Sequence, residues 1–122
     1  MKIKIILIVT IVTLLSCDRD SCGNAKSISG KYLNSDNPSY INYILIKPNN
    51  LYFQVYKNGN IKRVSKGKWI SSDYGDCKLI FYDWENIIDS SKSRKKITNE
   101  AYFRNDKLYF EDIDNEDYEK EN

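Results

Sequence analysis

From residue 30 onward, the chain is built of short runs of Tyr, Ile, Phe, Val and Trp separated by Asn, Asp, Gly and Pro. Such runs, bounded by residues that favour turns, are typical of antiparallel β-strands joined by hairpins. The sequence therefore predicts an all-β fold, a small up-and-down meander barrel or half barrel of about seven to eight strands. A flattened sandwich is the alternative architecture.

One predicted hairpin has its turn at Asn49 and Asn50. This turn places Ile46 opposite Phe53 and Ile44 opposite Val55 on the inner face of the sheet. The same register leaves aromatic rings with polar tips on the outer face. These rings belong to Tyr43, Tyr52 and Tyr56.

Two further turns are predicted at Asn58-Gly59 and at Asn105-Asp106, since such pairs accept a positive φ. The first places Val55 opposite Lys62. The second places Tyr102 opposite Tyr109 on the outer face of the sheet.

The first residues of the chain have the composition of an export signal. Lys2 and Lys4 provide positive charge, and residues 5–15 are apolar except for two threonines. Eleven residues are too few to cross a hydrocarbon core, which needs about 20, so a cleaved signal peptide is the better interpretation.

The end of this segment, Leu14-Leu15-Ser16-Cys17, resembles the lipobox of bacterial lipoproteins. The resemblance implies that Cys17 becomes the first residue of the mature protein and carries a diacylglycerol, which anchors the chain in the bacterial cell envelope. It leaves the inner and the outer membrane open. An ordinary secretory signal is the alternative. The expected organisation is a signal peptide over 1–16, a lipidated tether over 17–29, an antiparallel β domain over 30–113 and an acidic tail over 114–122.

Two segments, Gly30-Lys31-Tyr32 and Gly67-Lys68-Trp69, carry a glycine two positions before an aromatic residue. This punctuation resembles that of small lipocalin-like lipoproteins of bacteria. The resemblance covers residues 30–113 and implies a lipocalin-like barrel. Gly67 itself predicts a bulge or a sharp bend.

Three cysteines are present in the chain. If Cys17 carries lipid, Cys22 and Cys77 remain, and an exported compartment permits a disulfide between them. Two unpaired thiols are the alternative, because spacing alone does not show that the sulfurs meet.

The charge of the chain is close to balanced. It has 19 basic and 17 acidic residues, and loss of Lys2 and Lys4 with the signal leaves the mature part formally neutral. Residues 57–68 nevertheless hold basic side chains and no acid. The overall balance favours neither nucleic acid nor an anionic membrane as a partner, and we expect no nucleic-acid binding.

Histidine is absent, which removes the usual general base and the commonest zinc ligand. Carboxylates are the remaining catalytic candidates. We expect a protein that is not an enzyme and holds neither a cofactor nor a metal. The carboxylates that lie near one another in sequence are Asp73, Asp76, Asp83 and Glu85.

Two functions from different classes fit these observations. The first is a membrane-anchored binding module, inhibitor or immunity-like, that docks an envelope or secreted protein through a tyrosine-rich sheet face. The second is a lipocalin-like carrier that holds a small apolar ligand inside the barrel. The binding residues expected for the first function are Tyr43, Tyr52, Tyr56, Lys62, Arg63, Tyr102 and Tyr109.

Overall fold

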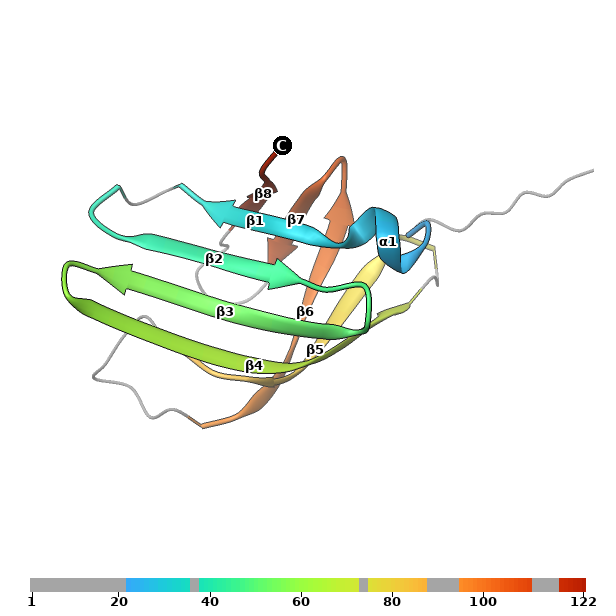
Figure 1. Ribbon diagram of the computed structural model, residues 1–122. Coiled ribbons are helices and arrows are strands. Elements are labelled where there is room, and N and C mark those ends of the chain that lie inside the picture. The colour runs from blue at the N-terminus through green and yellow to red at the C-terminus, as the bar shows by residue number, and fades with distance from the viewer. Residues whose placement is uncertain (1–21, 36–37, 73–74, 88–94, 111–116) are drawn as a thin grey trace, which may run out of the picture.

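The computed structural model describes residues 22–35, 38–72, 75–87, 95–110 and 117–122 (Figure 1). They form one short helix followed by eight strands. The elements are α1 (Ala25–Ile28), β1 (Gly30–Asn34), β2 (Ile41–Ile46), β3 (Leu51–Asn58), β4 (Ile61–Ser72), β5 (Lys78–Trp84), β6 (Ile97–Arg104), β7 (Lys107–Phe110) and β8 (Asp117–Lys120).

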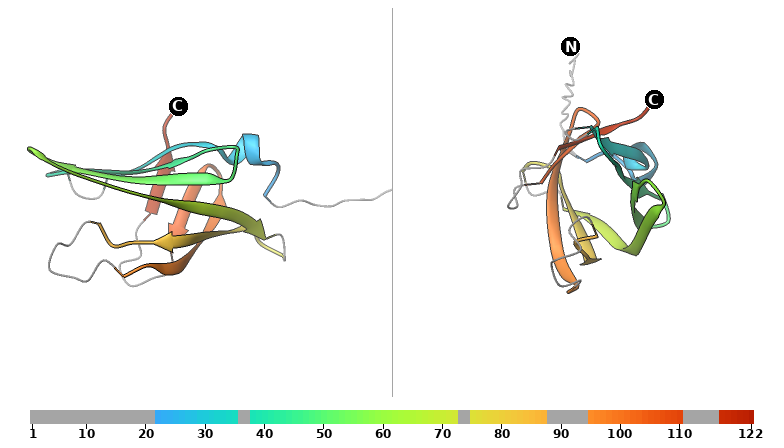
Figure 2. Two further views of the ribbon diagram at one scale, coloured as in Figure 1. Left: turned by 60° about the horizontal axis from the view of Figure 1, so that its bottom comes forward. Right: turned by 90° about the vertical axis from the view of Figure 1, so that its left-hand side faces the viewer.

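Each strand pairs with the next along the chain, and β8 pairs with β1, so the strands form a closed antiparallel barrel. Strands β1 to β4 lie in front in Figure 1, and β6 and β7 cross behind them. The two further views show the same two groups of strands enclosing the interior (Figure 2). The predicted all-β up-and-down barrel is confirmed, in its fully closed form with eight strands.

Aromatic rings fill the middle of the barrel. Tyr52 meets Phe81 edge to face with 5.0 Å between ring centroids, and Trp84 lies 5.9 Å from Tyr52 and 5.1 Å from Phe110. Tyr118 continues the cluster at 5.5 Å from Phe110. Offset and edge-to-face contacts of this kind add to the free energy gained by burying the rings.

The hairpin between β2 and β3 differs from the prediction by one residue. Ile46 lies opposite Tyr52 and Tyr43 opposite Val55, so the loop is longer than the two-residue turn we expected. Asn50, at a φ of 69°, donates from its side chain to the Trp69 carbonyl oxygen at 3.0 Å. This contact with a distant strand stabilises the longer loop. Because the pairing differs by one residue from the predicted register, each side chain of β3 lies on the opposite face from the one we expected.

The other two predicted turns have different outcomes. At the end of β3, Asn58 pairs with Ile61, so the turn residues are Gly59 and Asn60 instead of Asn58 and Gly59. Val55 consequently meets Val64, and the predicted pairing of Val55 with Lys62 is wrong. The turn at Asn105-Asp106 is confirmed: both residues have positive φ. Tyr102 pairs with Tyr109, as predicted.

Gly67 lies two residues before β4 changes its partner: Lys68 still pairs with β3, and Trp69 pairs with β5. A Cβ atom at this position would lie 2.2 Å from the Tyr82 carbonyl oxygen and 2.8 Å from the Tyr52 ring. The same carbonyl oxygen accepts a hydrogen bond from the Tyr52 hydroxyl at 2.6 Å. Glycine is therefore required here by the close approach of two strands and one ring.

The N-terminal end of the described chain is packed on the barrel. Cys22 and Cys77 form a disulfide, as we expected, and both are 3% exposed. Ile28 of α1 is buried, and the Tyr32 hydroxyl donates to its carbonyl oxygen. The expectation of a tether over 17–29 is therefore wrong for residues 22–29, which belong to the folded domain.

The C-terminal end also belongs to the barrel. Strand β8 lies within the segment expected to be an acidic tail, and it pairs with both β7 and β1. Tyr118 is the reason: its side chain is 2% exposed, and its hydroxyl accepts a hydrogen bond from the Asn42 amide at 2.8 Å. The acidic residues on either side of it, Asp117 and Glu119, are exposed.

Candidate interaction surface

The outer face of β1 to β4 carries apolar side chains in consecutive register. Leu33 lies opposite Tyr43, Tyr43 opposite Val55, and Val55 opposite Val64. Val64 is 47% exposed, although it belongs to a strand whose inner face lines the core. The row therefore places apolar surface on the outside of the barrel.

A second row runs beside the first. Lys31 lies opposite Leu45, Leu45 opposite Phe53, and Phe53 opposite Lys66, so a lysine stands at each end of this row. Side chains in neighbouring rows of one sheet face are within reach of one another. The apolar double row, as we name it, consists of Leu33, Tyr43, Leu45, Phe53, Val55 and Val64.

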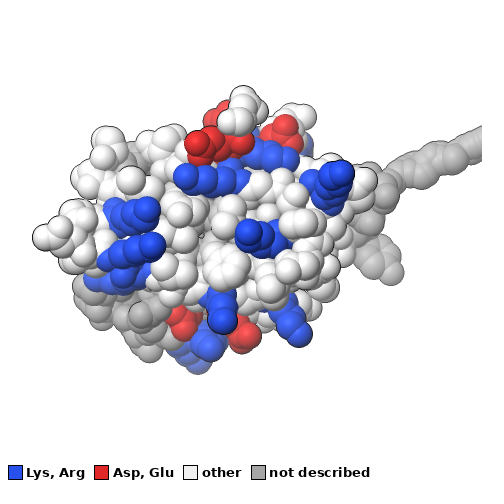
Figure 3. Space-filling model, viewed as in Figure 1, with Lys and Arg blue, Asp and Glu red and all other residues white. Residues whose placement is uncertain are grey.

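The strands beneath the apolar double row contain no carboxylate. Residues 41–72, which span β2, β3 and β4, include six basic residues and no Asp or Glu. We call the outward side chains of these strands the acid-free face. Figure 3 shows Lys and Arg side chains spread over this side of the molecule, with acidic side chains gathered at its upper and lower margins. The basic residues are Lys47, Lys57, Lys62, Arg63, Lys66 and Lys68.

Two of these cations stand directly opposite each other. Lys57 of β3 pairs in register with Lys62 of β4, and both positions face outward. Like charges at directly opposed positions of a sheet destabilise it. The acid-free face therefore contains a repulsive arrangement that the fold does not need.

Two of the tyrosines expected on the surface lie inside the barrel. Tyr52 is fully buried and Tyr56 is 7% exposed, so their prediction as binding residues is wrong. Burial, followed by the nearby carboxylates of Asp83 and Glu85, raises the pKa of the Tyr52 hydroxyl. Tyr52 thus stays a neutral hydrogen-bond donor within the core.

The two basic residues expected to bind a partner lie on opposite faces of β4. Lys62 points outward and is exposed. Arg63 points inward at the far end of the barrel, where its guanidinium lies 5.3 Å from the centre of the Tyr56 ring and donates to the Ile87 carbonyl oxygen at 2.9 Å. Arg63 therefore contributes to closing that end of the barrel.

The remaining predicted tyrosines lie on two different sides. Tyr43 is on the outer face of β2, with the Lys31 ammonium 4.4 Å from its ring centre. Tyr102 and Tyr109 face each other on the outer side of β6 and β7. Because β6 and β7 cross behind the front strands, the structure does not assemble one tyrosine-rich face from the predicted residues (Figure 1).

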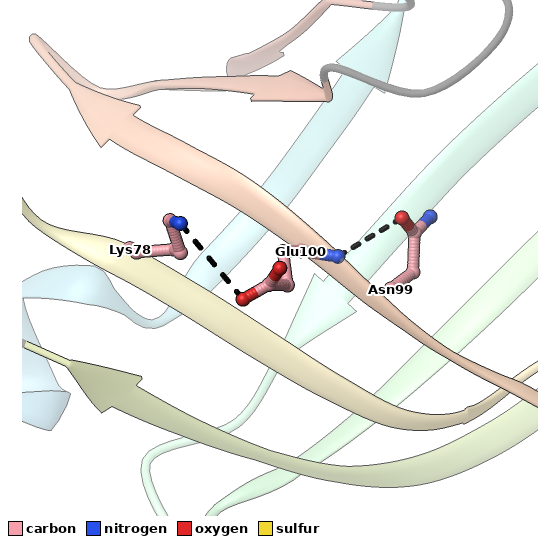
Figure 4. A network of polar contacts seen from close by, with 3 residues as sticks. All are labelled: Lys78, Asn99 and Glu100. Carbon is pink, nitrogen blue, oxygen red and sulfur yellow. Dashed lines mark hydrogen bonds and ion pairs between the residues drawn. The ribbon is translucent and has the colours of Figure 1, made fainter.

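The outer side of β5 and β6 pairs its charges internally. The Lys78 ammonium lies 3.9 Å from a Glu100 carboxylate oxygen and 5.1 Å from the centre of the Tyr102 ring. Figure 4 shows this pair across the two strands, with the Asn99 side chain accepting from the Glu100 backbone N–H at 2.9 Å. This surface is balanced in charge, unlike the acid-free face.

The candidate catalytic carboxylates do not assemble into a described cluster. Asp76 lies 3.8 Å from the Arg104 guanidinium at the surface, and Asp83 sits at a positive φ in the irregular stretch of β5. The Glu85 backbone exchanges two hydrogen bonds with the Gln54 amide. Asp73 and the predicted lipidation residue Cys17 lie outside the described residues. Within the described ranges, no three metal-ligating side chains stand together.

Sequence reasoning missed the apolar double row, because the register error placed Phe53 and Val55 inside. The signal that could have found the surface is the long absence of carboxylates from 41–72, of which we noted only part. Three strands without one acid must present an unbalanced face wherever they lie side by side.

Comparison with known proteins gives no relative: no family model, no curated protein and no solved structure matches the chain. In the part of the chain that the structure describes, no helix is long and apolar enough to cross a membrane.

Proposed function

We propose that the chain is a membrane-anchored, extracytoplasmic binding module of the bacterial cell envelope, with an envelope or secreted protein as its partner. The lipobox-like segment ending at Cys17 supports the anchor. An inhibitor or immunity-like role fits such a module, because it acts by holding its partner and performs no chemistry.

The observation that carries the proposal is where the barrel places its apolar surface. Its interior is filled by rings in mutual contact, while Val64 and Ile70 of β4 are 47% and 41% exposed. A carrier needs an open apolar cavity, whereas a docking module needs apolar surface outside. The packing thus favours the binding module over the carrier of a small apolar ligand.

The disulfide supports a defined orientation for the anchored barrel. Cys22 follows Cys17 by five positions. An extended chain covers at most about 3.5 Å per residue, so a lipid on Cys17 would hold Cys22 within about 17 Å of the membrane surface. Helix α1 would then face the membrane, and the turn between β3 and β4, at the opposite end in Figure 1, would point away from it.

Two measurements test the proposal on the full chain produced in a bacterial host. Mass spectrometry of the membrane fraction should find an N-terminal Cys17 that carries lipid, and Cys17→Ser should remove the protein from that fraction. The chain extracted in mild detergent should capture a defined protein from envelope or secreted fractions. Unmodified Cys17, or no captured protein, would contradict the proposal.

A further inference from the structure

We infer that the acid-free face is the docking surface of this module, and that its partner is a protein whose contact surface combines carboxylates with apolar side chains. This inference rests on the proposed function and adds the location of the contact and the chemistry of the partner. It follows from the charge and the apolar pattern of β2 to β4 taken together.

The charge pattern favours a partner that brings anions, because residues 41–72 supply none to this face. Outward positions of β4 alternate Lys62, Val64, Lys66, and Lys68 follows on the same side; all four are exposed. Lys62 also meets Lys57 in register, which costs stability that an acid at either position would recover. A carboxylate-bearing surface placed over these strands removes the repulsion and gains favourable charge complementarity.

The apolar double row requires more than charge from the partner. Tyr43, Val55 and Val64 are contiguous across three strands, and Leu45 and Phe53 lie beside them. Protein interfaces combine an apolar centre with a polar rim. Here the lysines at the two ends of the second row, Lys31 and Lys66, supply part of such a rim.

The form of this surface favours a protein over a lipid bilayer. Val55 is 6% exposed, and Leu45 and Phe53 are partly buried, so neighbouring side chains cover much of the centre of the apolar double row. Insertion into a bilayer needs apolar side chains that reach past the cations into the acyl region. An apolar centre that its neighbours partly cover, with lysines beside it, does not reach past these cations and instead matches a protein interface with an apolar centre and a polar rim.

The test uses full chain in mild detergent and immobilised copolymers of known chemistry. Poly(Glu,Tyr) offers carboxylates with aromatic rings, polyglutamate offers carboxylates alone, and phosphatidylglycerol vesicles offer an anionic bilayer. We expect binding to poly(Glu,Tyr) that is tighter than binding to polyglutamate. Raising the salt from about 0.05 M to about 0.5 M should weaken it about tenfold, because exposed charges are then screened.

Matched variants locate the contact. The double variant Lys66→Glu with Lys68→Glu, and the variant Val64→Asp, should each reduce poly(Glu,Tyr) binding about tenfold, since each places carboxylates on the acid-free face. The control Lys95→Glu with Lys96→Glu changes the net charge equally at exposed positions outside β2–β4 and should leave binding unchanged. Thermal unfolding of each variant checks that the exposed substitutions leave the fold intact.

Equal losses in the test and control variants would overturn the inference, as would binding to the vesicles without binding to poly(Glu,Tyr). The protein captured in the test of the proposed function distinguishes an error in the docking surface from an error in the proposed function. If Lys66→Glu with Lys68→Glu still captures that protein, the docking surface is wrong while the binding module stands. If the unaltered chain captures no protein, the proposed function itself fails.

Discussion

The two halves of the barrel share one core but differ in how their surface charges are distributed. In the first half, β1 to β4 carry no carboxylate, while cations lie on β1, β3 and β4. In the second half, β5 to β8, Lys78 meets Glu100 across neighbouring strands, and acidic residues flank Tyr118. The whole chain has 19 basic and 17 acidic residues, yet one side of the barrel is rich in cations. A nearly balanced net charge therefore does not reveal how the order of the strands separates the charges.

The two halves are joined by the disulfide, and its loss should have the largest effect. Cys22 precedes β1, Cys77 precedes β5, and the closed loop spans 55 residues. Replacing both by serine should lower the free energy of unfolding by about 4 kcal/mol, because the unfolded chain gains entropy. Denaturant titration measures the change, and reduction of the unaltered chain should reproduce it. An unchanged midpoint would show that the halves hold together without the bond.

A substitution at Gly67, where β4 of the first half closely approaches β5 of the second, should give the next largest loss of stability. Gly67→Ala forces a methyl group against the Tyr82 carbonyl and the Tyr52 ring, with an expected cost of about 3 kcal/mol. Gly59→Ala is the control for the close approach: Gly59 has a positive φ, which Gly67 does not, but no atom lies within 4 Å of the added carbon. That substitution should cost about 1 kcal/mol. Equal costs in thermal melts would refute the close approach at Gly67.

A smaller effect should appear at alkaline pH. Burial raises the pKa of Tyr52 in the folded state above the ordinary value of about 10. The stability due to the protonated hydroxyl is therefore complete below about pH 10 and is lost as the pH rises through the folded-state value. Tyr52→Phe should cost about 1 kcal/mol at neutral pH, through the lost hydrogen bond to the Tyr82 carbonyl, and should weaken the alkaline loss.

Tyr43→Phe, on the outer face, serves as the control for this titration. Its side chain is partly exposed, so the substitution removes one tyrosine hydroxyl without changing the core. If Tyr52→Phe and Tyr43→Phe give the same curves, the buried position of Tyr52 has no influence on alkaline stability.

The charges themselves should give the smallest effects, of opposite sign in the two halves. Lys62→Glu places an acid opposite Lys57 and should stabilise the domain by about 0.5 kcal/mol at low salt. Lys78→Glu places an acid beside Glu100 and should destabilise it by a similar amount, about 0.5 kcal/mol. Denaturant titration at low and at high salt measures both changes in stability. Changes of the same sign would remove the contrast between the halves.

The sequence was sufficient for the architecture but not for the register of its first half. The hairpin at Asn105-Asp106 was predictable because its turn depends on local φ preferences alone. The hairpin at Asn49-Asn50 was not, because Asn50 bonds to Trp69 on another strand. That slip of one residue moved Tyr52 from the expected surface to the core.

Contacts between distant parts of the chain also explain why the ends of the domain were not predicted. Strand β8 was hidden because Tyr118 is a single apolar ring within an acidic run, and local composition does not reveal that the barrel has a gap for it. For residues 22–29 the bond between Cys22 and Cys77 was expected, but the burial of Ile28 and its contact with the Tyr32 hydroxyl were not, because they depend on the packed barrel. The cation-rich stretch, by contrast, was visible in sequence, and only the face it occupies needed the structure.

The pairing of β8 with β1 has a kinetic consequence. Tyr32 meets Lys120, so the ring closes through a contact between nearly the first and nearly the last residue of the described barrel. Contacts so distant along the chain form late and slow the folding of β proteins. Until they form, the unpaired edges of β1 and β8 are templates for association with other chains. We therefore expect refolding yield to fall as protein concentration rises, although the finished ring leaves neither edge available.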